Sequence, residues 1–272
     1  MSSLSPTTFR FALDHGVGTI TLDRPSRLNS LTFESYVELG AFLPKLGASP
    51  EVRAVVITGA GGAFCSGGDR HDIIAKLFER DMAGLLEFTR ITGDLIRAIR
   101  ALRRPVIAAV DGVAVGAGAV IALACDVRIA SDDARFGFVF PRVGLCGADM
   151  GAAYLLPRVV GLGRASELLF LGDLVDAQES LRIGLVNRVV PKGEALAVAT
   201  QWARRLSEGP AFAHAMTKQM LESEHGMTLD DAIEAEAQAQ AICMAHPDFR
   251  EAFDALIAKR PPRFRGAPGG EG

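Results

Sequence analysis

The chain has 272 residues, 49% of them apolar and 22% charged, which is typical of one large globular domain or of such a domain with an appendage. A formal net charge of -3 and a pI near 6.0 give no electrostatic reason to expect a nucleic-acid partner or an anionic membrane surface. The sequence has no run of about 18 apolar residues and no N-terminal cationic region followed by an apolar stretch. We therefore predict a cytoplasmic location without a membrane span, although a cleaved organellar presequence is compatible with this N-terminus.

The first half of the chain alternates short apolar runs, glycine turns and helical patterns. Strands are predicted for residues 9–23, 52–58, 106–110 and 127–130, with another beginning at 63–64. Helices are predicted for residues 33–47, 81–103 and 119–125. This order predicts parallel strands covered by helices, and therefore an α/β fold.

The second half becomes increasingly helical. A helix over 165–171 is followed by a second helix with Asp176 as N-cap and Gly184 just past its end, and then by a strand over 185–190. Further helices are predicted over 195–207, 210–222, 229–245 and 248–259, the third opened by a capping box of Thr228 and Asp231. The pattern divides the chain into a strand-rich core, residues 1–194, and a helical region, residues 195–272, that is either a domain cap or an oligomer interface.

Two glycine-rich turns, residues 64–69 and 116–118, each follow a predicted strand and precede a helical segment. In that context backbone N–H groups are exposed at a helix N-terminus, where they and the helix dipole stabilise developing negative charge. Two such donors aimed at one oxygen form an oxyanion hole. The alternative is a pair of ordinary tight turns. Neither turn fits a dinucleotide fingerprint, a P-loop or a nucleophile elbow.

Cysteine and histidine spacing predicts neither a disulfide framework nor a metal site. The cysteines are far apart in sequence, and no two histidines are spaced as a ligand pair. These residues are Cys65, Cys125, Cys146, Cys243, His15, His71, His214, His225 and His246.

Several short motifs follow one another in a specific order along almost the whole chain. They are Asp23-Arg24-Pro25, Leu28-Asn29-Ser30-Leu31, FCSGGD at 64–69, RPVIAAVDG at 104–112, Gly116-Ala117-Gly118, Ala124-Cys125-Asp126, Leu171-Gly172, Gly184-Leu185-Val186 and Lys259-Arg260. Each is weak alone, but their order and spacing are specific. Together they resemble the crotonase superfamily, the enoyl-CoA hydratase/isomerase family.

The resemblance implies a spiral of ββα turns with a C-terminal helical trimerisation region, assembled as a homotrimer or a dimer of trimers. It implies a CoA thioester substrate, with coenzyme A entering as part of the substrate and no separate cofactor. The backbone donors that grip the thioester carbonyl fall on Gly68 and Ala117. The residues that the resemblance places along the substrate are Arg24, Leu28, Gly67, Asp69, Ile73, Val120, Phe140 and Lys259. For Lys259, a solvated surface lysine is the alternative reading.

The chain departs from the family pattern at the two glutamates that hydratases of this family use. Those positions hold Val120 and Phe140. Hydration normally relies on two acids that orient water and deliver a proton, so the usual hydratase mechanism is in doubt. Phe140, with Phe138, either shapes a pocket for a flat acyl group or packs in the core.

One carboxylate, Asp149, remains near these positions, where the dienoyl-CoA isomerase branch of the family carries an acid. Apolar surroundings should raise its pKa and suit it to proton transfer. The alternative is an N-cap for a helix over 150–156. Other candidates are His71-Asp72, for which the alternative is the solvated start of a helix, and Cys146, for which the alternative is a packed thiol.

These observations favour a hydratase- or isomerase-type enzyme that stabilises a thioester enolate at Gly68 and Ala117 and moves protons with Asp149. An acyl-CoA hydrolase or dehalogenase on the same scaffold is the first alternative. A catalytically silent CoA-thioester binder is the second. RNA binding is a third class, which the acidic balance and the lack of a basic stripe argue against.

Overall fold

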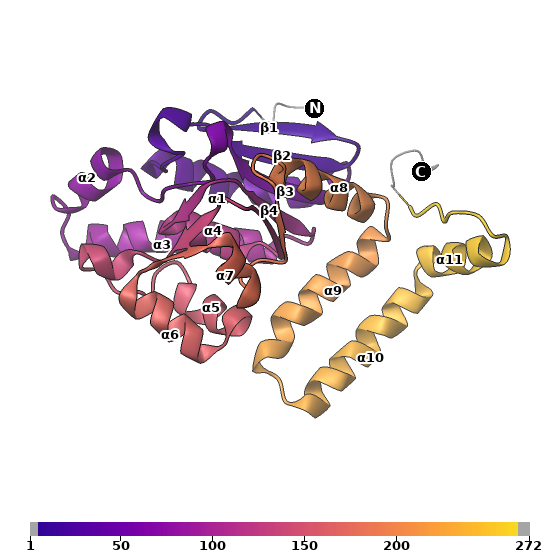
Figure 1. The fold of residues 1–272 in the computed structure, drawn as a ribbon. Coiled ribbons are helices and arrows are strands. Elements are labelled where there is room, and N and C mark those ends of the chain that lie inside the picture. Colours follow the sequence, from indigo (N-terminus) through magenta and orange to yellow (C-terminus); the bar gives the residue numbers. More distant parts are fainter. Residues whose placement is uncertain (1–4, 266–272) are drawn as a thin grey trace.

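Six strands form the main sheet of the computed structural model, which describes residues 5–265. They are β1 (Phe9–Asp14), β2 (Val17–Leu22), β3 (Ala54–Gly59), β4 (Val106–Val110), β6 (Val127–Ser131) and β9 (Arg188–Val190), in the order β1-β2-β3-β4-β6-β9. The β1–β2 hairpin is antiparallel and the other neighbouring pairs are parallel. Parallel neighbours need long crossover connections, and the helices of the core provide them (Figure 1).

The central strands are buried on both faces, as expected of a parallel sheet covered on each side. In β3, Val55 and Ile57 belong to the large hydrophobic core, whereas Ala54 and Val56 face a second, smaller core. Helix α8 (Ala195–Ser207) closes the smaller core. Its buried apolar residues are alanines four positions apart, Ala195, Ala199 and Ala203. These small side chains allow α8 to lie close to the sheet.

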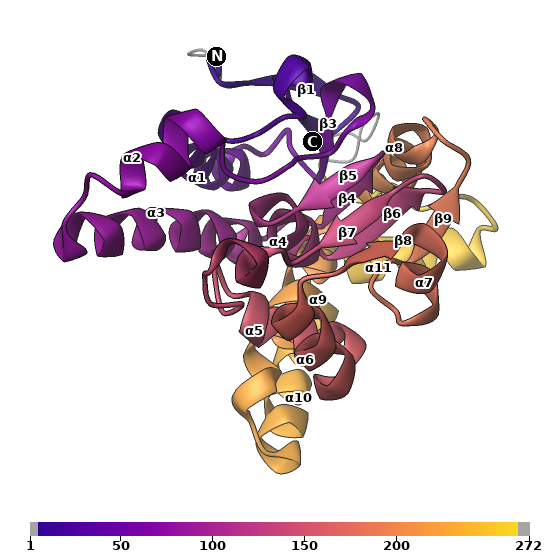
Figure 2. The ribbon, with the colours of Figure 1, turned by 60° about the vertical axis from the view of Figure 1, so that its left-hand side comes forward.

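A second sheet contains three short strands, β5 (Val113–Val115), β7 (Arg135–Gly137) and β8 (Leu174–Asp176). The chain passes from β4 through β5 into α4 (Ala117–Ala124), and from β6 through β7 towards α5 (Ala152–Val160). Helices α6 (Leu162–Leu171) and α7 (Ala177–Arg182) follow (Figure 2). This repetition confirms the predicted α/β spiral of ββα turns.

Helix α1 (Phe33–Ala48) packs along α3 (Met82–Ala101), and the short α2 (Ala75–Leu77) precedes α3. Aromatic side chains join the two long helices. Phe88 meets Phe33 and Tyr36 edge-on, with ring centroids 5.1 and 6.0 Å apart. This pairing holds α1 beside the first glycine turn, which follows β3 in the chain.

Beyond α8 the chain leaves the core as a helical hairpin of α9 (Ala211–Ser223) and α10 (Leu229–Ala245), followed by α11 (Pro247–Ile257) (Figure 1). Each of α9 and α10 has one buried residue, Lys218 and Ala239. More than half of each of several large apolar side chains is exposed in this part: Leu221, Leu229, Ile233, Ile242, Met244, Phe249, Phe253, Leu256 and Ile257. The division of the chain at residue 194 stays a prediction, and α8 packs with the core rather than with this hairpin.

Most predicted elements are present, with some differences at their ends. Asp176 caps α7 through a 2.8 Å hydrogen bond from the Glu179 amide, and Thr228 caps α10. No strand begins at 63–64 in the described chain; Cys65 makes an isolated bridge to Ala114 instead. The predicted strand over 185–190 is reduced to β9. Among residues 5–265, no helix combines the length and apolar character needed to cross a bilayer.

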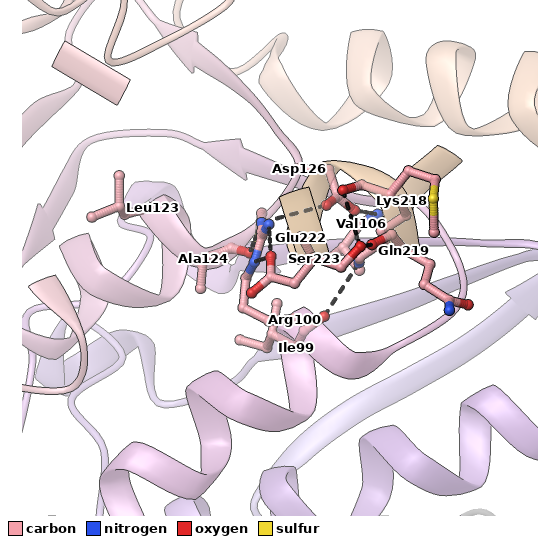
Figure 3. Close-up of polar contacts among 12 residues, drawn as sticks. Ile99, Arg100, Val106, Leu123, Ala124, Asp126, Lys218, Gln219, Glu222 and Ser223 are labelled. Atoms are coloured by element: carbon pink, nitrogen blue, oxygen red, sulfur yellow. Dashed lines mark hydrogen bonds and ion pairs between the residues drawn. The ribbon is translucent and has the colours of Figure 1, made fainter. Parts of the chain in front are cut away.

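A buried ion cluster attaches α9 to the core (Figure 3). Lys218 Nζ lies 2.8 Å from Asp126 Oδ2 and donates to two backbone carbonyl oxygens. Arg100 lies 3.6 Å from Asp126 Oδ1, and its Nε donates to Glu222 Oε2 at 2.9 Å. Burial lowers the pKa of Lys218, and Asp126 opposes that shift. The orientation of α9 therefore depends on charges that are largely removed from water.

We expect Lys218→Ala to lower the free energy of unfolding by about 3 kcal/mol, because it leaves a partly buried Asp126 carboxylate without its nearest cation. Urea unfolding followed by circular dichroism measures the change. Lys192→Ala is the matched control. Lys192 pairs with Asp133 at the same kind of distance, 2.9 Å, but 73% of its side chain is exposed. The urea midpoint of the Lys192→Ala variant should therefore change little. Equal shifts for the two variants would show that burial of the Lys218–Asp126 pair is not the cause of the loss.

Candidate active site

The two glycine turns pack directly against each other. We call residues 64–69 the first turn and residues 115–118 the second turn. The Val115 amide donates to the Cys65 carbonyl oxygen at 2.9 Å. A Cβ on Gly118 would lie 2.2 Å from that oxygen, and a Cβ on Gly67 would lie 3.0 Å from the Val115 carbonyl oxygen. Gly67 also has a φ of +94°, so the approach of the turns requires glycine on both sides.

The first turn leaves one backbone amide without an acceptor within residues 5–265, and the second turn leaves two, those of Ala117 and Gly118. Leu31 donates to the Gly67 carbonyl oxygen at 2.8 Å and accepts from the Asp69 amide at 2.9 Å. The Gly68 amide between them donates no hydrogen bond to residues 5–265, and neither does the Ala117 amide at the start of α4. Both amides are therefore available to an acceptor from outside the chain.

Helix α4 carries the second of these amides, and its whole length is buried. Its C-terminal carbonyl groups are satisfied by guanidinium groups. Arg128 Nη1 donates to the carbonyl oxygens of Leu123 and Cys125 at 3.2 and 2.6 Å, and Arg100 donates to that of Ala124 at 3.3 Å. Cations at this end are favourably placed for the helix dipole, whose positive end is at Ala117.

Asp69, predicted to contact the substrate, has its carboxylate turned into the protein. It caps the helical turn Arg70–Ile74 by accepting from the His71 and Asp72 amides. Burial raises its pKa, but the hydrogen bonds from Asp72, His71 and Ser30 and the charge of Arg24 outweigh burial and hold the pKa well below its usual range. Asp69 is therefore a buried carboxylate whose surroundings favour its ionised form, and contact between this group and a substrate is not supported.

Arg24, also predicted along the substrate, is bound internally. Its guanidinium group lies 3.3 Å from Asp69 and 3.1 Å from Asp72, and donates to the Ser30 carbonyl oxygen at 2.9 Å. Leu28 is 52% exposed and therefore accessible to a ligand. Arg24 is therefore held by internal partners and does not offer a free cation.

Three other predicted contact residues are enclosed. Ile73 lies under Gly68, where a Cβ on the glycine would meet its side chain at 3.5 Å. Val120 has no exposed surface and Phe140 is 7% exposed. With Phe138, the latter two belong to the large core. Phe138 and Phe140 are therefore packed in the core and do not form a pocket for a flat acyl group. Val120 is likewise a core residue without exposed surface.

Asp149 lies in a strained loop that leads into α5. Met150 and Gly151 both have positive φ angles, +51° and +86°. Gly151 is the N-cap of α5 and no side chain caps that helix, so the predicted capping role of Asp149 is wrong. Burial raises the pKa of Asp149, opposed by the Met150 amide. No cation pairs with it within residues 5–265, so it is a desolvated carboxyl group of the kind suited to proton transfer.

Tyr36, which sequence analysis overlooked, is buried near both Cys65 of the first turn and Asp149. The residue is 2% exposed. Burial raises its pKa well above the usual value, and the nearby Cys65 and Asp149 side chains add to the shift. One phenol is therefore within electrostatic reach of the first turn and of Asp149. A buried tyrosine on a helix gives no sequence signal, because its spacing is that of a core residue.

The remaining candidate side chains are less suited to act as nucleophiles, general acids or bases, or metal ligands. Burial raises the pKa of the Cys65 thiol to about 12, so it is no thiolate at neutral pH. Cys146 is exposed, which corrects the expectation of a packed thiol. His71 is exposed at the start of its helical turn, as expected of a solvated residue, and Asp72 pairs with Arg24. Among residues 5–265 no group of His, Cys, Asp and Glu side chains is placed to hold a metal ion.

A cavity of about 370 Å³ adjoins the Asp149 loop. The two residues that follow Asp149, Met150 and Gly151, form one wall, and Ile96 and Leu155 contribute apolar surface. Its lining includes neither glycine turn, so it is a neighbour of the paired turns rather than their own binding cleft.

Comparison with known proteins identifies the family. Residues 13–267 match the family described as Enoyl-CoA hydratase/isomerase. The chain is 37% identical to the 1,2-epoxyphenylacetyl-CoA isomerase of Escherichia coli (strain K12), over 94% of this chain and 98% of that protein. It is 35% identical to the short-chain-enoyl-CoA hydratase of Clostridium acetobutylicum, over 90% and 92% of the two chains. A solved structure from Streptomyces coelicolor A3(2) shares 50% identity, with a TM-score of 0.93 over 98% of each chain.

The ββα spiral with two facing glycine turns is that of the crotonase class of enzymes. The chain belongs to the enoyl-CoA hydratase/isomerase family, as the sequence predicted, and it is an enzyme of the hydratase/isomerase type.

Proposed function

We propose that the amides of Gly68 and Ala117 donate to the carbonyl oxygen of an acyl-CoA thioester, and that Asp149 moves a proton on the acyl group. Removal of a proton from carbon sends its electron pair towards the thioester oxygen. Two fixed donors and the positive end of α4 stabilise that charge. Support comes from the unused amides, the direct packing of the two turns, and the desolvated Asp149.

The observation that carries the proposal is the presence of one desolvated carboxyl group, Asp149, with Val120 and Phe140 in place of the two hydratase glutamates. One carboxylate can take a proton from one carbon and return it to another, whereas addition of water normally uses two acids. Isomerisation of an unsaturated acyl-CoA is therefore favoured over hydration. The likeness to an enzyme named 1,2-epoxyphenylacetyl-CoA isomerase is in keeping with this.

Three further features belong to the same proposal. Coenzyme A enters with the substrate, and no separate cofactor takes part. The exposed apolar faces of α9, α10 and α11 join copies of the chain into a trimer or a dimer of trimers in the cytoplasm. Figure 1 shows α11 and α2 on opposite sides of the molecule, and we propose that Lys259, just past α11, approaches the CoA bound to a neighbouring copy.

Proton transfer can be tested directly by hydrogen exchange in D₂O. A panel of 2-enoyl-, 3-enoyl- and 3,5-dienoyl-CoA thioesters is incubated with the protein, and mass spectrometry follows deuterium in the acyl group while chromatography follows double-bond position. Deuterium uptake with double-bond migration is the expected result. Hydrated product without migration would identify a hydratase, and no reaction with retained binding would identify a silent binder.

A hydrolase or dehalogenase reaction would use the Asp149 carboxylate as a nucleophile instead of a base. Release of free CoA thiol, or of halide from a haloaromatic acyl-CoA, distinguishes these reactions from isomerisation. Either result would overturn the proton-transfer role while leaving the two amide donors in place.

A further inference from the structure

The Asp69 carboxylate accepts three hydrogen bonds and pairs with one guanidinium group. Oδ1 accepts from the His71 and Asp72 amides at 2.9 and 3.1 Å. Oδ2 accepts from the Ser30 hydroxyl at 2.8 Å and lies 3.3 Å from Arg24 Nη1. Each oxygen has two partners, which is what a carboxylate can accommodate. With 4% of the residue exposed, the carboxylate is enclosed by these internal partners.

The peptide group between Gly67 and Gly68 carries the amide that we assign to the substrate. Its carbonyl oxygen accepts from the Leu31 amide at 2.8 Å. In a planar trans peptide the N–H points opposite to the C=O, so this bond sets the direction of the Gly68 N–H. The next peptide group is held as well, since the Asp69 amide donates to the Leu31 carbonyl oxygen at 2.9 Å. Leu31 thus fixes the peptide groups on both sides of Gly68.

Asp69 links the first turn to the segment Ser30–Leu31. Its side chain binds Ser30, the residue before Leu31, while its own backbone binds Leu31. Arg24 balances the buried charge and also donates to the Ser30 carbonyl oxygen at 2.9 Å. The segment that sets the direction of the Gly68 amide is therefore fastened to the first turn through one carboxylate.

We infer that Asp69 is a positioning residue that fixes the Gly68 amide for carbonyl polarisation, through Ser30, Arg24 and the helical turn Arg70–Ile74. This inference rests on the proposed oxyanion role of Gly68. It assigns Asp69 no contact with substrate. Loss of the carboxylate charge weakens the hold on the first turn and lets the amide turn away from the thioester oxygen.

Asp69→Asn tests the inference, because asparagine keeps the size of the side chain and can still cap the helical turn. Its NH₂ group then faces two donors, Ser30 and Arg24. The probe is 4-(dimethylamino)cinnamoyl-CoA, a chromophoric enoyl-CoA whose absorption moves to longer wavelength when its carbonyl is polarised. We expect the shift of the bound probe to be largely lost, and kcat on the substrate found in the deuterium assay to fall about ten- to a hundredfold. KM should change much less.

Two variants keep the test decisive. Ser30→Ala removes one of the four partners and should reduce the spectral shift partially, even where Asp69→Asn fails to fold. Asp176→Asn is the control, since Asp176 is also a helix-capping aspartate but lies at α7 and is exposed. It should leave the spectral shift and kcat unchanged. A full shift and full kcat in both Asp69→Asn and Ser30→Ala would overturn the inference alone. If the wild-type protein itself binds the probe without a shift, the proposed oxyanion site fails and the inference falls with it.

Discussion

Asp149→Asn is expected to abolish most acyl-CoA isomerisation, with kcat falling about a hundredfold or more, because asparagine cannot accept a proton from carbon. Binding of the thioester should persist, since the two donors that we propose for it are main-chain amides, those of Gly68 and Ala117. Steady-state kinetics with the substrate found in the deuterium assay measures the loss, and calorimetry measures binding. Full turnover by the variant would remove Asp149 from the mechanism.

The same variant should be at least as stable as the wild-type protein. The pKa of Asp149 is raised by burial, so in the pH window between its unfolded and folded values the folded state binds more protons than the unfolded state. The contribution of Asp149 to the free energy of unfolding is therefore fully present at low pH. It is lost as the pH rises through the folded pKa, because the buried group must then carry a charge. Asparagine avoids that loss. At pH 7, thermal unfolding should thus show an equal or higher Tm, which separates loss of activity from loss of fold.

The wild-type pH profile should reflect the same shift. Because the role that we propose for Asp149 requires its ionised form, kcat/KM should fall as the pH drops through its raised pKa. The acid limb should therefore lie above the usual aspartate range, whereas an acid limb at an ordinary aspartate value would point to another group.

Gly118→Ala is expected to have the second large effect. The added Cβ would lie 2.2 Å from the Cys65 carbonyl oxygen, which is main chain and cannot move aside alone. The two turns must separate, and kcat should fall about a hundredfold through misplacement of an oxyanion donor. Stability should fall by about 1–3 kcal/mol from overpacking. Enzyme assays and urea unfolding measure the two losses.

Gly163→Ala is a closely matched control for this variant. Gly163 is the second residue of α6, as Gly118 is of α4, and nothing lies within 4 Å of a Cβ added there. Alanine in a helix is favoured over glycine by up to about 1 kcal/mol, so this variant should be fully active and slightly more stable. Equal losses in the two variants would mean that the contact with Cys65 is not the cause.

Much of the fold follows from the sequence because its signals are local. The apolar run over 106–110 and the cap residues Asp176 and Thr228 predict their elements by periodicity or by a side chain at a helix end. The short strands β5, β7 and β8 were missed, because three residues carry no detectable period. The strand expected at 63–64 is absent because Cys65 makes only an isolated bridge before the chain turns at Gly67.

The site was only partly predictable, because residue type does not reveal which way a side chain points. The glycine turns were located from sequence, and the structure packs them together. Asp69 and Arg24 looked like ligand contacts, yet they bind each other inside the protein. No sequence pattern marks Tyr36, because only the folded chain brings this residue of α1 close to Cys65 and Asp149. Such long-range pairings need the assembled fold.

The burial of α4 along its whole length restricts how the enzyme can admit a bulky acyl chain. Neither end of this helix is free, because one meets the first turn and the other is held by Arg100 and Arg128. The segment 75–82, from α2 to the start of α3, is less enclosed, and Phe78 and Met82 there are 86% and 78% exposed. Amide hydrogen exchange should accordingly be fast in segment 75–82 and slow in α4, and this difference would identify 75–82 as the side that moves to admit the acyl chain.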